Sequence, residues 1–360
     1  MILFGMQDIA RQVKRNCDIS DAKSWGFYSI CGLLLRLREL YLSEHGLPPW
    51  EKIEHGLITS WIGKKEALWK ALSGEDYAEI EIEGVRFPPF GAALINKALA
   101  ARKLLYGAGY GPHMKATFFL ADLVRRERVD GLDVFIAGRE YARDLSNAVA
   151  MLKGDVVVAR LDAARHLIWQ KYEEYRTKKR SHTGAATFTT QTLALAFETY
   201  GIGPEEPEAE MVLERTALPE LETYIRHEIG EASEGKRLGP AWAELIMSSA
   251  EPKTNLFLRA VKDVLADTTE KGMLRYITGE RRAGSLAFYI LFLAGYRRLL
   301  SRPMEEAFRE FLSTRNWDLL GPAASTVYKK ATEISSAILE LRKAGQSIGP
   351  FVEETLGGLK

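Results

Sequence analysis

The chain contains little cysteine: two of its 360 residues, Cys17 and Cys31. Their spacing matches no zinc-binding or redox pattern, and two thiols do not build the disulfide framework of a small secreted domain. The N-terminal segment MILFGMQDIARQVKRNC has no basic leader followed by an apolar run, so it does not resemble a secretory signal. We therefore expect a soluble, reduced, cytoplasmic protein.

The chain also has no excess of charge of one sign, since 49 basic and 48 acidic residues leave a net charge of +1. No global field attracts nucleic acid or an anionic membrane, so any such binding requires a local patch. The densest basic run, RTKKR, ends an expected helix, where the helix dipole alone favours positive charge. We expect no nucleic-acid binding except through Arg176–Arg180.

Long hydrophobic runs are missing as well. The longest, AGSLAFYILFLAGY, covers residues 283–296 between two arginine pairs. It falls short of the ~20 apolar residues that a membrane-spanning helix needs. We expect a buried core helix here and no membrane association.

What the chain does have is globular composition, with 46% apolar and 27% charged residues. The periodicity predicts a mostly α fold with a small α+β insertion: a helical N-terminal part with one or two β-hairpins and an all-α C-terminal bundle. The segment GIGPEEPEAE, residues 201–210, is rich in glycine, proline and glutamate and is the best candidate for a linker. We expect a first domain over residues 1–200, this linker, and a helical domain over residues 211–360.

The mixed α/β part is expected at about residues 77–160. One hairpin is predicted in YAEIEIEGVRF, with its bend at Glu83-Gly84, and a second around Asp130-Gly131. A helix is expected over residues 139–153, and DVVVARLD is typical of one short strand. Beyond the linker, the pattern predicts helices at 218–234, 240–249, 253–268, 281–300, 303–313 and 323–344.

The stretch YIRHEIGEASEG carries the strongest chemical pattern. HEIGE, residues 227–231, resembles the zinc-protease helix motif H-E-x-x-H, with Glu231 in place of the second histidine. Glu220 and His227, two helical turns apart, also resemble the first ligand helix of haem-oxygenase-like di-iron oxidases. That resemblance covers one helix and implies further histidine ligands on a later helix, whereas no histidine follows His227.

These residues suggest a metal site with Glu220, His227 and Glu231 as ligands for Zn, Fe or Mn. They also suggest acid–base chemistry by His227, Glu228 and Glu231. A helical wheel, however, places Glu220, Tyr224, His227, Glu231 and Glu234 opposite the apolar face. The alternative interpretation is therefore a solvated helix face.

Two acidic residues on a later helix are further candidate ligands for this metal site. Asp263 and Asp267 share one face of the expected helix RAVKDVLAD and could complete an all-carboxylate site. Arg259, four residues before Asp263, predicts instead a salt-bridge ladder along that helix.

A second candidate is the loop GAGYGPHMK, where glycines alternate before His113 and Lys115. Glycine lets a backbone approach a phosphate closely, and a lysine can neutralise it. The spacing matches neither the P-loop nor the dinucleotide fingerprint, so a plain connector is the alternative. The candidate cofactor-binding residues are Gly109, Gly111, His113 and Lys115.

Two functional hypotheses remain open. In the first, the chain holds a metal or small-molecule site built from His227, Glu228 and Glu231, joined by His113 or His166. In the second, it is a non-catalytic helical scaffold or adaptor that binds a protein or an RNA. The sequence decides neither the substrate nor the oligomeric state.

Overall fold

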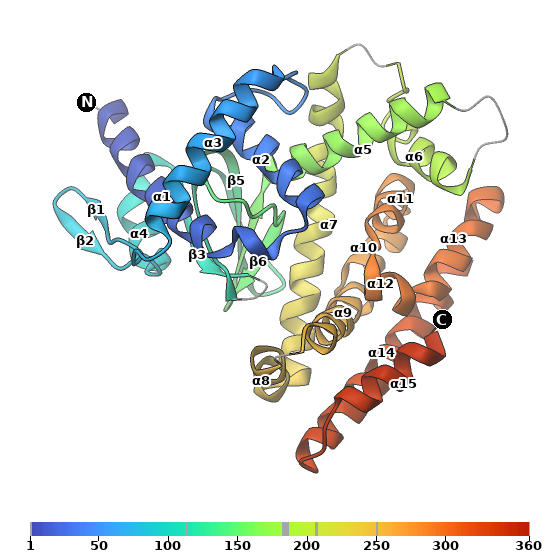
Figure 1. Ribbon diagram of the computed structural model, residues 1–360. Coiled ribbons are helices and arrows are strands. Elements are labelled where there is room, and N and C mark those ends of the chain that lie inside the picture. Colours follow the sequence, from blue (N-terminus) through green and yellow to red (C-terminus); the bar gives the residue numbers. More distant parts are fainter. Residues whose placement is uncertain (1, 112–113, 182–186, 206–207, 250, 360) are drawn as a thin grey trace. The chain divides into compact units, whose positions relative to one another are not determined.

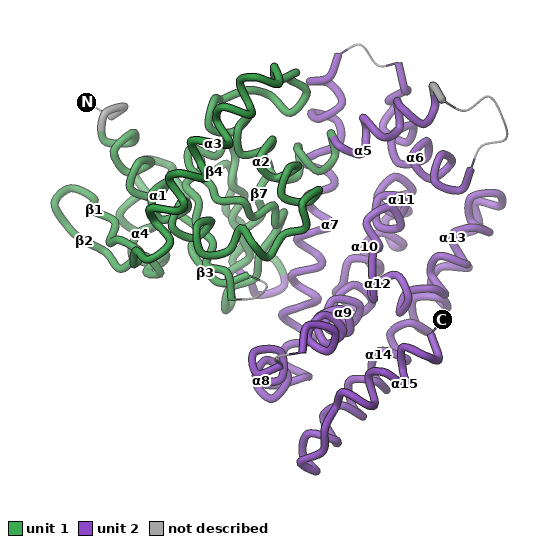
Figure 2. The backbone as a smooth tube through the Cα atoms, viewed as in Figure 1, with its two compact units in different colours: residues 1–129, 133–169 green, residues 130–132, 170–360 purple. Residues whose placement is uncertain are grey.

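In a computed structural model of the chain, residues 2–111, 114–181, 187–205, 208–249 and 251–359 are described. The chain forms two compact units (Figures 1 and 2). One comprises residues 1–129 and 133–169, and the other residues 130–132 and 170–360. The mostly α fold with a small β region in the N-terminal half is confirmed.

The N-terminal unit combines helices with two sheets. Its helices and 3-10 turns are α1 (Ile2–Ser24), η1 (Trp25–Phe27), α2 (Ile30–Glu44), α3 (His55–Leu72), α4 (Ala92–Leu99) and η2 (Ala100–Arg102). Strands β1 (Ile80–Ile82) and β2 (Val85–Phe87) pair as an antiparallel hairpin. The larger sheet has the order β3-β4-β5-β7-β6, with strands β3 (Leu104–Tyr110), β4 (Ala116–Val129), β5 (Leu132–Arg143), β6 (Ala150–Lys153) and β7 (Val156–Arg160).

Both predicted hairpins are present. The turn between β4 and β5 consists of Asp130 (φ 51°) and Gly131 (φ 88°), a pair that readily adopts positive φ. One face of the sheet is covered by α1, whose Ile9, Val13 and Cys17 share a core with strand residues such as Phe118.

The helix expected over residues 139–153 is wrong. Strand β5 continues to Arg143, and β6 follows before β7. Glu140 of β5 is buried in the sheet and binds Arg160 of β7 through Oε1–Nε (2.5 Å) and Oε2–NH2 (2.9 Å).

The C-terminal unit is helical in its described residues after Gln170. It contains the C-terminal part of α5 (Leu161–Ser181), then α6 (Phe188–Glu198), α7 (Ala209–Leu238), α8 (Pro240–Ser248), α9 (Pro252–Thr268), α10 (Met273–Gly279) and α11 (Ala283–Phe292). There follow α12 (Gly295–Leu300), α13 (Arg302–Thr314), η4 (Trp317–Leu319), α14 (Leu320–Lys343) and α15 (Gly349–Leu359). The predicted linker segment therefore connects α6 to α7 within this unit.

The C-terminal helices differ from the expected ones in three respects. Helix α7 begins at Ala209 and contains Pro219, whose carbonyl accepts a hydrogen bond from Arg282 NH2 (2.7 Å). The helix expected at 281–300 is divided at Leu293–Ala294 into α11 and α12. Helices α10 and α15 had no counterpart among the expected ones. The apolar run in α11 is buried, as predicted.

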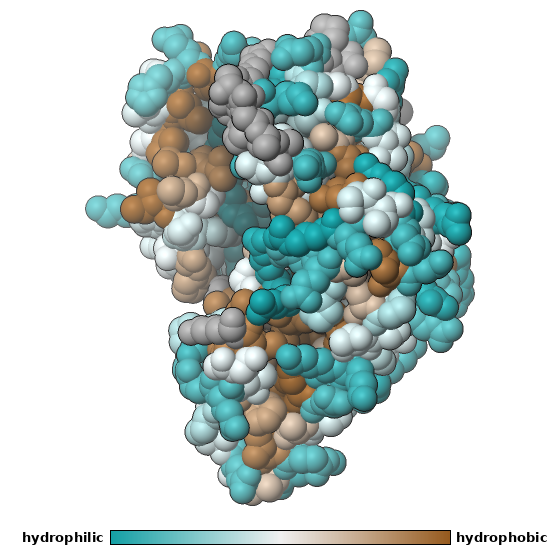
Figure 3. Space-filling model, turned by 90° about the vertical axis from the view of Figure 1, so that its right-hand side faces the viewer, coloured by the Kyte–Doolittle hydropathy of each residue, from teal (hydrophilic) through white to brown (hydrophobic). Residues whose placement is uncertain are grey.

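The surface is mixed in character. The face seen in Figure 3 carries hydrophilic residues with patches of apolar ones between them. No helix within the described ranges is both long and apolar enough to span a membrane.

Candidate functional site

The site lies where α7 packs against α9, which is seen nearly end-on beside α7 in Figure 1. Their backbones approach closely at Gly230, because a Cβ atom built there would lie 2.1 Å from the carbonyl oxygen of Ala266. Only glycine fits at such a crossing. The close approach brings His227 and Glu231 of α7 opposite Asp267 and Asp263 of α9.

Three side chains meet in this crossing: His227, Glu231 and Asp263. Each offers one ligand atom, and these atoms all lie within 4.8 Å of one another. All three residues are partly buried. One imidazole and two carboxylates are a nitrogen and oxygen donor set suited to divalent transition metals.

A buried acid holds the imidazole in place. His227 Nδ1 lies 2.7 Å from Asp267 Oδ1, and Asp267 Oδ2 accepts a hydrogen bond from Arg297 NH2 at 2.7 Å. Asp267 is fully buried. Burial opposes a charged imidazole, but the Asp267 carboxylate outweighs it and raises the pKa of His227 to about 9.

Two further charged groups adjoin the three. Lys262 Nζ binds Glu231 Oε1 at 2.7 Å. Burial alone would raise the pKa of Glu231, but the positive charges of Lys262 and His227 outweigh burial and lower it. Glu228 is buried, and burial together with the neighbouring Glu231 raises its pKa to about 7, although His227 and Lys262 oppose the shift. An acid with such a pKa can both accept and donate a proton near neutral pH.

The predicted solvated face on α7 is wrong. Glu220 and Glu234 are each only 2% exposed, whereas Leu218, on the predicted apolar face, is 40% exposed. Helix α7 packs against both α9 and α10, so neighbours cover more than one side of it. The helical-wheel prediction assumed that other helices cover only one face of α7. It was wrong because α10, which was not among the expected helices, also packs against α7.

Glu220, a predicted metal ligand, lies in a different polar cluster. Its carboxylate accepts hydrogen bonds from the hydroxyls of Tyr200 and Ser285, the latter at 2.7 Å, and Arg282 lies 3.9 Å away. Burial raises the pKa of Glu220 despite these partners. Asp263, rather than the predicted Glu220, lies beside His227 and Glu231.

The salt-bridge ladder predicted along α9 is also wrong. Arg259 Nε donates to Asn255 Oδ1 (2.8 Å), and Asp267 is engaged by His227 and Arg297. Asp267 therefore faces α7 and α12, and Asp263 interacts with Arg259 only electrostatically, without an ion pair between them among the described residues.

The glycine-rich loop has a structural explanation for part of its pattern. Gly109 lies within strand β3 and pairs with Thr117 of β4, Gly111 N donates to Lys115 O (2.8 Å), and His113 lies outside the described residues. The ammonium of Lys115 binds Asp21 Oδ1 (2.8 Å), with Asp144 at 4.0 Å. Its charge is thus balanced inside the N-terminal unit, and ligand binding by this loop stays a prediction.

His166 belongs to the N-terminal unit and has a cationic environment. It is 8% exposed, and burial together with Arg143, Arg38, Arg160 and Arg165 lowers its pKa to about 3. An imidazole among arginines is a poor place for a metal cation, so His166 is not a candidate ligand.

This environment predicts acid sensitivity of the N-terminal unit. The unfolded chain binds a proton at His166 below pH ~6.5, whereas the folded one does not until about pH 3. Stability is therefore complete above pH ~6.5 and falls by ~1.4 kcal/mol per pH unit below it. Urea unfolding measures the free energy of unfolding at pH 6.5 and at pH 5. The decrease between these two pH values is expected to be about 2 kcal/mol larger in the wild type than in His166→Gln. Equal losses in both proteins would contradict this assignment.

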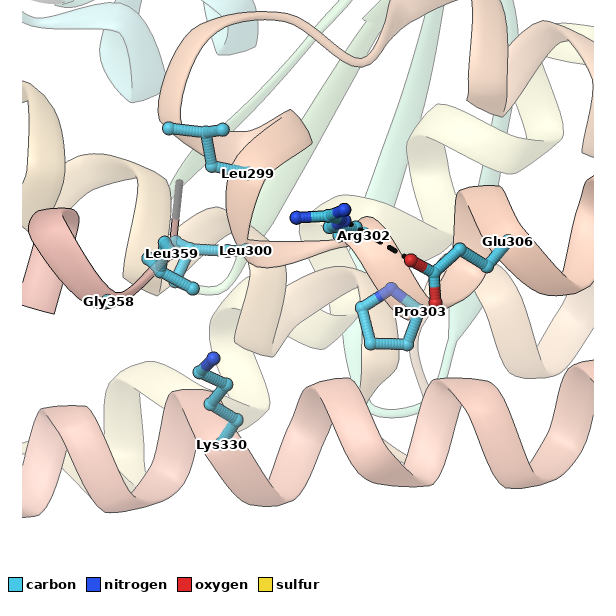
Figure 4. Close-up of a pocket in the computed structure, with 8 residues that line it drawn as sticks. All are labelled: Leu299, Leu300, Arg302, Pro303, Glu306, Lys330, Gly358 and Leu359. Carbon is cyan, nitrogen blue, oxygen red and sulfur yellow. Dashed lines mark hydrogen bonds and ion pairs between the residues drawn. The ribbon is translucent and has the colours of Figure 1, made fainter.

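A small cavity in the C-terminal unit contains none of the candidate residues. It has a volume of about 150 Å³ and is lined by Leu299, Leu300, Arg302, Pro303, Glu306, Lys330, Gly358 and Leu359 (Figure 4). Arg302 Nε binds Glu306 Oε1 at 3.2 Å there. Its volume is below the range of ~300–1,000 Å³ that is usual for small-molecule sites.

Comparison with protein-family models gives two adjoining matches. Residues 8–160 match the N-terminal domain of a family of unknown function (DUF6866), and residues 165–356 match the C-terminal domain of the same family. The chain belongs to the DUF6866 family. The DUF6866 N-terminal domain ends with strand β7, and the C-terminal domain contains His227, Glu231, Asp263 and Asp267. No curated protein and no solved structure matches the chain.

Proposed function

We propose that the C-terminal domain binds a divalent transition metal, Zn, Fe or Mn, through His227, Glu231 and Asp263. The observation that carries the proposal is the hydrogen bond between His227 Nδ1 and Asp267. It leaves Nε2 as the coordinating nitrogen, which would release its proton to solvent when the metal binds, because the raised pKa of His227 keeps the ring protonated at neutral pH. A carboxylate behind a ligand histidine is the usual means of fixing its ring and raising its basicity.

The metal would replace a cation that is already there. Lys262 now binds Glu231, so the ammonium has to move when Glu231 becomes a ligand. Ligand atoms around a metal with bonds of about 2.1 Å lie roughly 3.4 Å apart, so the three side chains, now within 4.8 Å, need only a small contraction. Rotamer changes of partly buried side chains can supply it.

Glu228 gives the site its proposed chemistry. Its carboxyl group has a pKa of about 7 and lies in the same cluster as His227 and Glu231. A metal held by His227, Glu231 and Asp263 would supply Lewis-acid activation of water, and Glu228 would be the residue that accepts the proton. The reaction class that follows is metal-assisted hydrolysis or hydration.

The affinity for Mn²⁺ distinguishes a proposed ligand, Glu231, from the neighbouring acid Glu228. Titration of the protein with Mn²⁺, followed by electron paramagnetic resonance, is expected to give one site per chain. Glu231→Gln should lower the affinity roughly 100-fold or more, because an amide is a poor replacement for a carboxylate ligand. Glu228→Gln, one turn away on the same helix, should leave it within about threefold.

Two results would count against the proposal. Equal affinities in wild type and Glu231→Gln would remove the three residues as ligands. A wild type that binds neither Mn²⁺ nor Zn²⁺ would favour the scaffold or adaptor instead.

A further inference from the structure

Two basic side chains of α9 adjoin the three candidate ligands. Lys262 binds Glu231, and Arg259 lies one helical turn before Asp263 on the same helix. Arg259 interacts electrostatically with both Asp263 and Glu231. The metal-free protein thus has two cations beside two carboxylates.

Among the described residues, only one nitrogen of the Arg259 guanidinium makes a hydrogen bond. Its Nε donates to Asn255, whereas its two terminal nitrogens have no hydrogen-bond partner within the described part of the chain. The residue is partly buried, and neither terminal nitrogen is among the fully buried unpartnered atoms of the described residues. A guanidinium with both terminal nitrogens open is suited to a two-point contact with a carboxylate or phosphoryl group.

A bound metal changes the charge balance. A divalent cation neutralises Glu231 and Asp263, while Asp267 remains engaged by Arg297. Lys262 and Arg259 then have no matching carboxylates. If Glu228 is ionised, its negative charge balances only one of these two cations. The metal-loaded cluster therefore has an excess of positive charge in a partly buried place.

We infer that the metal-loaded site binds an oxyanion, a carboxylate or phosphoryl group of its ligand, and that Arg259 is the residue that recognises it. This inference rests on the proposed metal site. One oxygen of the oxyanion would bind the metal, and the remaining oxygen of a carboxylate, or two further oxygens of a phosphoryl group, would face the guanidinium of Arg259. Lys262, released from Glu231, adds positive charge alongside.

The experiment uses the full chain loaded with Mn²⁺ and inorganic phosphate as the probe. Bound Mn²⁺ is expected to enhance the ³¹P relaxation of phosphate strongly and saturably in the wild type, and chloride at the same ionic strength should not displace it. Acetate should compete as a carboxylate. Arg259→Gln is expected to weaken phosphate binding about tenfold or more while Mn²⁺ affinity stays within about threefold.

Two variants complete the design. Arg259→Lys keeps the charge but not the fork, so it should recover part of the phosphate affinity and also report on folding. Arg275→Gln, on α10, removes an exposed arginine away from the candidate ligands and should behave as the wild type.

The outcomes are distinct. If Mn²⁺ binds but phosphate does not, or if phosphate binds Arg259→Gln as tightly as the wild type, the oxyanion inference is overturned and the metal site stands. If Mn²⁺ does not bind, both fail together.

Discussion

Replacing Asp267 with asparagine is expected to lower the free energy of unfolding of the C-terminal domain by about 3–5 kcal/mol. The carboxylate is fully buried between His227 of α7 and Arg297 of α12, with both contacts at 2.7 Å. An asparagine amide would point an N–H group at a cation and leave buried positive charge uncompensated. Urea unfolding at pH 7 measures the loss.

The matched control is Asp263→Asn, four residues earlier on α9. Asp263 is partly exposed and makes no hydrogen bond or ion pair with another described residue at short range. Its replacement should therefore change stability by less than about 1 kcal/mol while removing a proposed metal ligand. If the two variants were equally stable, Asp267 would not be the electrostatic centre of this crossing.

Replacing Gly230 with alanine is expected to destabilise the C-terminal domain by about 3 kcal/mol or more. The added Cβ would lie 2.1 Å from the carbonyl oxygen of Ala266 and 2.9 Å from its carbonyl carbon. Both are backbone atoms, so α7 and α9 would have to separate. That shift would also draw His227 away from Asp267, and Mn²⁺ affinity should fall with stability.

Gly235 provides the control on the same helix. A Cβ built there meets nothing within 4 Å, and the residue is exposed. Gly235→Ala should raise stability by up to ~1 kcal/mol through helix propensity. Opposite signs for the two substitutions are the expected result in thermal unfolding, and equal effects would show that helix packing at Gly230 is not tight.

Much of the fold could be predicted from residue patterns alone. The hairpins at Glu83-Gly84 and Asp130-Gly131 followed from alternation and turn residues, because both signals are local. The buried run in α11 followed from its composition. The segment over residues 139–153 was misassigned because Glu140 and Arg160 are buried as a pair, a contact between residues distant in sequence.

The candidate site was only half predictable. His227, Glu228 and Glu231 could be named because they lie on one helix. Asp263 was considered as a completing acid, but its partners depend on the crossing of α7 and α9, which the sequence does not encode locally. The role of Asp267 toward His227 and the burial of Glu220 likewise depend on which neighbours surround α7.

The most direct measurement is the metal content of the full-length protein purified without an affinity tag, compared with His227→Ala prepared identically. Elemental analysis is expected to find close to one Zn, Fe or Mn per wild-type chain and almost none in the variant. Because His227 is the proposed nitrogen ligand and is hydrogen-bonded to Asp267, its removal should abolish retention of the metal. A wild type without bound metal that also fails to take up Mn²⁺, or a variant that retains as much metal as the wild type, would contradict the account.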